Sequence, residues 1–186
     1  MMPVVNDAII GAGAAIAGGL LTGAYKHARD WWERPILQLD YLGSDGNRVD
    51  SGDEIYIRAR VQNGGKRLAK NCVVYLAQLT ERSISGQVPT VFHDAMPLAW
   101  PVWTFKPRDI PKGADFYVNI LRISKAVPGW QICVEQTYAS HEKLKTYKGT
   151  YRFTLLATAD DAVPAACDID VTYDQDWHSL RAVAGV

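Results

Sequence analysis

The stretch Tyr151–Thr158, YRFTLLAT, is the clearest guide to the architecture of this 186-residue chain. Every second residue from Tyr151 to Ala157 is aromatic or apolar. Side chains of a β-strand point alternately to its two faces, so this period of two predicts a strand with one buried face. The stretch Cys167–Asp174, CDIDVTYD, shows the same alternation with acidic and hydroxyl residues between the apolar ones. We therefore expect two half-buried strands near the C-terminal end.

Other strand-like stretches precede these two. They are Leu37–Tyr41, Ile55–Val61, Cys72–Leu79, Thr90–Phe92, Leu98–Phe105, Phe116–Ile120 and Trp130–Val134. Asp-Gly and Ser-Gly pairs in Gly43–Glu54 are typical of turns. About seven to nine short strands without a long amphipathic helix indicate two packed sheets. We predict a mainly β chain, with an immunoglobulin-like two-sheet antiparallel β-sandwich over residues 36–175 and a C-terminal tail over residues 176–186.

A run without Asp, Glu, Lys or Arg, Ala8–Tyr25 (AIIGAGAAIAGGLLTGAY), precedes the predicted sandwich. As a helix it would be about 27 Å long, close to the thickness of the hydrocarbon core of a bilayer. We therefore predict one transmembrane helix within residues 1–35. Small residues recur at every fourth position and share one helical face, which favours close packing against another helix. These residues are Gly11, Ala15, Gly19 and Gly23.

The segment after the apolar run is basic and rich in tryptophan. Its characteristic residues are Lys26, Arg29, Trp31, Trp32 and Arg34. Cations and paired tryptophans are typical of a membrane–water boundary, and the positive-inside rule then predicts a cytoplasmic sandwich. We expect membrane lipid and another helix, from a partner or a second copy, to contact this region. The alternative is a virion, in which neighbouring subunits would bury the helix.

Charge and cysteine content restrict the class of protein. Lys plus Arg and Asp plus Glu both number 20, so no net field attracts the chain to nucleic acid, and we predict no nucleic-acid partner. Cys72 and Cys133 lie on predicted strands at a separation compatible with an inter-sheet disulfide of immunoglobulin type. Gln131 stands where such a domain carries the tyrosine of its tyrosine corner, and three cysteines are an odd number. We therefore favour buried free thiols.

The segments Val61–Gly65 and Ala69–Leu76 together contain V-x-N-x-G…A…V-x-L. This pattern resembles bacterial adhesion-related, immunoglobulin-like domains of the CARDB type, and Lys148–Phe153 is similar to the G-x-Y-x-hydrophobic sequence that precedes a strand in such sandwiches. The resemblance implies a fold and a binding or scaffolding role, and it carries over no catalytic residue. In this motif Asn63 and Gly64 suit a turn that needs positive φ, and Ala69 suits a crowded return.

Several residue types invite a search for chemistry. The acidic turn Gly43–Glu54 offers oxygen ligands for calcium, but its spacing differs from an EF-hand, and such residues commonly cap their own backbone. The histidines are His27, His93, His141 and His178, and none belongs to a metal-ligand repeat or a recognisable nucleophile motif. We predict a protein that is not an enzyme, with no catalytic residue, metal or cofactor.

The segment Leu98–Phe105 contains the candidate ligand surface, Trp100 and Trp103. We expect an extended strand that projects both indoles to one face, where they would stack on a sugar or bind an apolar or Pro-rich partner. The alternative is that both tryptophans fill the core of the sandwich.

These observations favour a non-enzymatic, membrane-anchored immunoglobulin-like interaction or scaffold module that self-associates or docks through its Gly-rich helix. A second hypothesis makes the chain a structural subunit of a phage or viral particle. A third makes it an extracytoplasmic adhesion or carbohydrate-binding domain. We expect a homo-oligomer or a part of a larger assembly.

Overall fold

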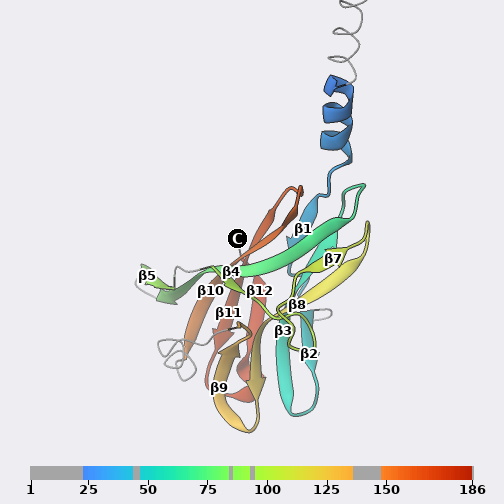
Figure 1. The fold of residues 1–186 in the computed structure, drawn as a ribbon. Helices are drawn as coiled ribbons and strands as arrows, with labels where there is room; N and C mark the ends of the chain where they lie inside the picture. Colours follow the sequence, from blue (N-terminus) through green and yellow to red (C-terminus); the bar gives the residue numbers. More distant parts are fainter. Residues whose placement is uncertain (1–22, 44–46, 84–85, 93–94, 136–147, 186) are drawn as a thin grey trace, which may run out of the picture. The chain divides into compact units, whose positions relative to one another are not determined.

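A computed structural model describes residues 23–43, 47–83, 86–92, 95–135 and 148–185 (Figure 1). The chain divides into two compact units, residues 1–34 and residues 35–186.

The described part of the first unit is a helix of 11 residues, 23–33. At 1.5 Å per residue it is about 16 Å long, roughly half of a hydrocarbon core. It also carries four charged residues, of which Arg29 and Glu33 form an ion pair of 2.9 Å between Nε and Oε1. Across the described residues, no helix is long and apolar enough to cross a membrane. The predicted single-pass membrane location is wrong on this finding.

The small-residue positions fall mostly outside this helix. Gly11, Ala15 and Gly19 lie outside the described residues, whereas Gly23 is the first residue of the helix. A Cβ atom added at Gly23 would meet no other atom within 4 Å. The packing role predicted for these four residues therefore stays a prediction.

The second unit is built from β-strands, which confirms the predicted mainly β class. The strands are β1 (Leu37–Asp40), β2 (Arg48–Asp50), β3 (Glu54–Asn63), β4 (Ala69–Ser83), β5 (Gly86–Phe92), β6 (Met96–Pro97), β7 (Arg108–Ile110), β8 (Asp115–Ser124), β9 (Val127–Ile132), β10 (Gly149–Asp160), β11 (Ala165–Tyr173) and β12 (Arg181–Ala184). A short 3-10 helix, Trp177–Ser179, precedes β12. The segment 176–186, predicted as a tail, thus contributes a strand.

These strands form two antiparallel sheets (Figure 1). The first has five strands in the order β1-β3-β8-β9, with β2 beside β3. The second has seven strands in the order β12-β11-β10-β4-β5, with β6 and β7 also paired to β4. Among these strands the chain changes sheet between β3 and β4, between β7 and β8, and between β9 and β10, so β3 pairs with β8 and β4 pairs with β10.

Aromatic side chains from both sheets meet in the core. The ring of Trp130 on β9 lies edge-on to Tyr151 and Phe153 on β10, with centroids 5.3 and 5.8 Å apart. The residues predicted to face inward from Tyr151 to Ala157 and from Ile55 to Val61 are buried at every second position. The alternation in the sequence is therefore confirmed as the division between core and surface.

Two bulges explain where the alternation of the sequence fails. Ala77 has no residue opposite it on β10, and Ile120 has none opposite it on β3. A bulge adds one residue to one strand, so the inward and outward positions exchange there. Leu76 and Leu79 are consequently both buried although they are three residues apart.

Asn63 takes a different role from the predicted turn. Neither Asn63 nor Gly64 has positive φ, which corrects that expectation, while Ala69 is completely buried. The Asn63 amide is also completely buried, and its Nδ2 donates to the carbonyl oxygens of Arg67 and Ile110 at 2.6 and 3.0 Å. Its Oδ1 accepts from the backbone N–H groups of Ile36 and Gly65 at 3.4 and 3.0 Å. The amide thus uses its full hydrogen-bonding capacity.

We expect Asn63→Ala to lower the free energy of unfolding by about 3 kcal/mol, because it leaves buried backbone groups without partners. The control is Gln62→Ala, one residue away on the outer face, which should cost less than about 0.5 kcal/mol. Urea denaturation of the full chain measures both. Equal losses for the two variants would contradict the role given to Asn63.

The three cysteines are free, which confirms the prediction for Cys72 and Cys133. Both of these thiols are completely buried, and Cys167 is half-buried. Desolvation by burial is the main cause that raises the pKa of each thiol to about 12. The folded state therefore keeps these protons at a pH where the unfolded chain loses them.

Above pH 9.0, the ordinary thiol value, the unfolded chain binds fewer protons than the folded chain, so stability should fall as the pH rises toward about 12. Cys133→Ala should reduce the steepness of this fall by up to about 1.4 kcal/mol per pH unit. The control, Val134→Ala, removes a buried neighbour without a titrating group and should leave the slope unchanged. Denaturation at pH 8 to 10.5 tests the difference, and identical slopes would refute it.

Candidate functional site

The segment between β6 and β7 differs from the predicted strand Leu98–Phe105. Leu98 and Ala99 form single bridges with Val134 and Asn119. The chain then turns at residues 101–103, and the N–H of Trp100 donates to the carbonyl oxygen of Thr104 at 2.8 Å. We call residues 101–104 the Trp103 loop.

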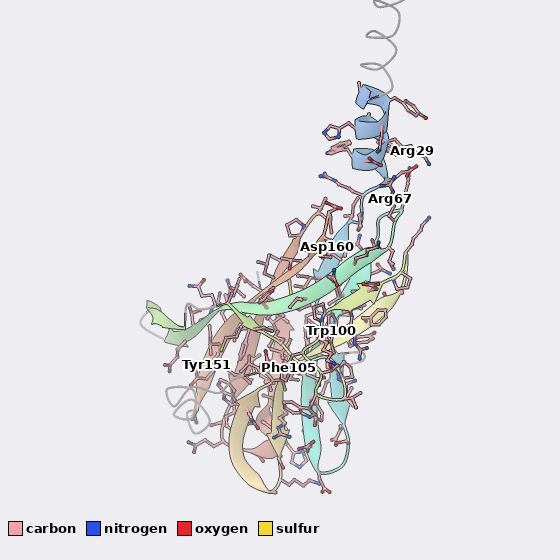
Figure 2. All side chains as sticks on the ribbon, in the orientation of Figure 1. Arg29, Arg67, Trp100, Phe105, Tyr151 and Asp160 are labelled. Atoms are coloured by element: carbon pink, nitrogen blue, oxygen red, sulfur yellow. The ribbon has the colours of Figure 1, made fainter. Side chains whose placement is uncertain are left out.

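The two tryptophans lie in different environments, so the prediction that they share one face is wrong. Trp100, labelled in Figure 2, is 1% exposed. Its ring packs edge-on to Phe116, with ring centroids 6.5 Å apart. Trp103 is 38% exposed. Residues three apart in a strand point to opposite faces, and the intervening turn separates this pair further. The core alternative therefore holds for Trp100 alone.

The backbone of the Trp103 loop is strained. Val102 has φ of 70° and Trp103 has φ of 53°. Positive φ costs an L-residue about 1–2 kcal/mol, and a β-branched residue such as valine is a clear outlier there. Val102 is nevertheless 90% exposed, so its side chain gains little packing in return. The loop holds an apolar side chain in water in a conformation that local sequence does not favour.

A cluster of polar and aromatic side chains supports Trp103 on the outer face of the five-stranded sheet. The guanidinium of Arg122 on β8 lies 4.6 Å from the centroid of the Trp103 ring. Arg122 also donates to Glu54 on β3 at 3.1 Å and to Gln131 on β9 at 2.8 Å. The hydroxyl of Tyr56 donates to the second Glu54 oxygen at 2.5 Å. Three adjacent strands therefore fix the position of the indole.

Tyr56 stands at the centre of this cluster. Burial raises the pKa of its hydroxyl, and the hydrogen bond to Glu54 raises it further. The polar groups of Trp103 and Arg122 nearby lower the pKa, each with a smaller effect. The phenol therefore stays protonated at neutral pH and can keep donating to Glu54.

Arg58, two residues further along β3, extends the cluster. Its guanidinium lies 5.7 Å from the centroid of the Tyr56 ring, and its Nε donates to Asn119 Oδ1 at 3.0 Å. Asn119 is buried, so the hydrogen bond anchors the base of the Arg58 fork. The cluster thus presents an aromatic pair and a cation on one sheet face.

The acidic turn caps its own backbone. Asn47 is buried, accepts from the N–H of Leu42 at 3.0 Å and donates to the carbonyl oxygen of Arg58 at 2.8 Å. Asp50 accepts from the N–H of Gly52 at 2.9 Å. Among the described residues, no group of three or more His, Cys, Asp and Glu could hold a metal ion.

The predicted boundary residues belong to the first unit. Lys26, Arg29, Trp31 and Trp32 lie in the helix 23–33, and Arg34 follows its end. Trp31 and Trp32 are 62% and 67% exposed, and the Arg34 guanidinium lies 4.9 Å from the Trp31 ring. These side chains offer a second aromatic surface.

Sequence reasoning missed Tyr56, Arg58 and Arg122. Tyr56 and Arg58 occupy outward positions of the correctly predicted strand Ile55–Val61, so the pattern did place them on the surface. Their proximity to Trp103 comes from the pairing of β3 with β8 and from the loop, neither of which has a local signal.

Comparison with known proteins adds no identification: no family model, curated protein or solved structure matches this chain.

We expect Val102→Gly to raise the free energy of unfolding by about 1 kcal/mol. Glycine relieves the positive φ, and this gain exceeds the extra entropy that glycine loses on folding. The control is Val183→Gly, at an exposed position of β12 without positive φ, which should lower stability. Thermal and urea denaturation measure both variants. A destabilised Val102→Gly protein would argue against strain in the loop.

Proposed function

We propose that this chain is a non-enzymatic interaction module with an immunoglobulin-like fold, and that the Trp103 loop is its contact surface. The observation that carries the proposal is the pair of adjacent positive-φ residues, Val102 and Trp103, at an exposed apolar tip. Backbone strain persists where the surrounding structure imposes it, and it is concentrated at functional sites. Binding residues are also found preferentially on loops held by a rigid scaffold.

The order of the strands supports the immunoglobulin-like part of the proposal. In that fold the second and fifth strands pair in one sheet, and the third and sixth pair in the other. Here β1-β3-β8 corresponds to strands A, B and E, and β5-β4-β10-β11 corresponds to C′, C, F and G. One departure is β9, which follows β8 in the chain, whereas strand D precedes strand E. The CARDB-type resemblance is part of this proposal.

The chemistry of the cluster supports binding over catalysis. Both oxygens of the Glu54 carboxylate are engaged, one by Tyr56 and one by Arg122. The Arg122 guanidinium lies against the Trp103 ring. The attraction between the cation and the face of the ring keeps the indole in place. The cluster therefore presents a preorganised surface, and preorganisation reduces the entropy lost when a partner binds.

Site-specific photocrosslinking tests the proposal. With p-benzoylphenylalanine at Val102, irradiation in extracts of the cells that make the protein should give a discrete crosslinked product, identifiable by mass spectrometry. The control places the same group at Val183, an exposed apolar position of the other sheet that is 58% exposed. Trp103→Ala should abolish the product. Absence of a product at Val102, or its survival in Trp103→Ala, would overturn the assigned contact surface.

The same experiment tests the expected docking of the N-terminal helix. The exposed Trp31 and Trp32 favour a partner here, because an isolated helix of this length is marginal in water without tertiary packing. With the photoreactive group at Trp31, a product with the mass of two chains would support self-association, as in a subunit of a larger particle. Lack of any product would count against assembly through this helix.

A further inference from the structure

We propose that the partner of the Trp103 loop is a peptide segment that carries a carboxylate beside an apolar side chain, and that Arg58 binds the carboxylate. This inference rests on the proposed function and names the chemistry of the partner. Val102 and Trp103 provide the apolar contact, and Arg58 provides the charged one. Tyr56 connects the two parts. Its hydroxyl shares the Glu54 carboxylate with Arg122, which lies against the Trp103 ring, and Arg58 lies against the Tyr56 ring.

Several other arginines on strands of the two sheets have carboxylate partners. Arg60 on β3 binds both oxygens of Asp40 at 2.7 and 3.0 Å. Arg122 pairs with Glu54 at 3.1 Å. Arg152 on β10 binds both oxygens of Asp170 at 2.8 and 2.9 Å. These pairs cancel charge locally and leave little to attract a ligand.

Arg58 differs from these neighbours. It is half-buried, and its Nε is bound to the neutral amide of Asn119 at 3.0 Å. Within the described part of the chain, no carboxylate lies within 4.0 Å of its guanidinium, and no hydrogen bond engages its two Nη groups. The Nε bond fixes the plane of the fork, so the Nη groups are oriented in advance.

An arginine fork with its terminal nitrogens available matches a carboxylate, which accepts two parallel N–H···O bonds. The aromatic and aliphatic groups beside it match an apolar side chain. Both features together favour an acidic peptide over a free anion, because a free anion would leave Val102 without a role. Charge complementarity thus selects a partner segment with an Asp or Glu next to a bulky apolar residue.

NMR titration of the 15N-labelled full chain tests this inference with two defined probes. One is acetyl-Leu-Glu-Leu-amide, and the other is its neutral isostere acetyl-Leu-Gln-Leu-amide. The glutamate peptide should shift the Trp103 indole N–H and the Arg58 Nε–H signals, with a dissociation constant at least about tenfold lower than that of the glutamine peptide. Arg58→Gln should remove this preference, and Arg58→Lys should restore part of it.

The matched control is Arg60→Gln, which removes the neighbouring paired guanidinium and should keep the preference for glutamate. The amide spectrum of each variant shows whether it is folded. Equal affinity for both peptides, with shifts at Trp103, would overturn the carboxylate site and leave the loop as a contact surface. Absence of shifts at Trp103 with either peptide would also overturn the inference. The photocrosslinking experiment at Val102 would then test the proposed function independently.

Discussion

The buried amide of Asn63 holds the two sheets in register at one end of the core. It bonds Ile36 ahead of β1 on one side and Ile110 of β7 on the other, and β7 pairs with β4 of the seven-stranded sheet. An aspartate could not donate to the two carbonyl oxygens, and an alanine would leave them unsatisfied. Asn63 is the last residue of β3 and must face inward. This requirement decides which residues of β3 face the core and which face outward. Tyr56 and Arg58 then face outward, where the candidate site forms.

The sequence predicts strands best where one face is buried without interruption. Along most of β3 and β10, every second residue is buried. The period of two can therefore be recognised from the sequence alone. In β4 and β8 the bulges at Ala77 and Ile120 change the phase within the strand. A bulge is a mismatch between two strands far apart in sequence, so no single stretch contains the information needed to locate it.

The loop was harder to predict than the strands for a related reason. In a sequence, Gly or Asn commonly indicates a position with positive φ. The turn contains neither, because its residues are Pro101, Val102 and Trp103. Tertiary contacts impose the conformation: Trp100 is anchored in the core, its N–H bonds Thr104, and Trp103 rests on Arg122. The sequence did single out both tryptophans as candidate residues. It could not separate their roles, because that separation depends on the turn between them.

The overall charge balance of the chain does not reveal how its charged residues are paired in the fold. Equal numbers of acidic and basic residues gave no indication of a partner's charge. The folded chain uses that balance in matched pairs, such as Arg60 with Asp40 and Arg152 with Asp170, and these cancel at distances beyond a Debye length. Arg58, set among such pairs, creates only a short-range field. A partner is therefore selected by the fit of a carboxylate and an apolar side chain at contact, and long-range electrostatic steering contributes little.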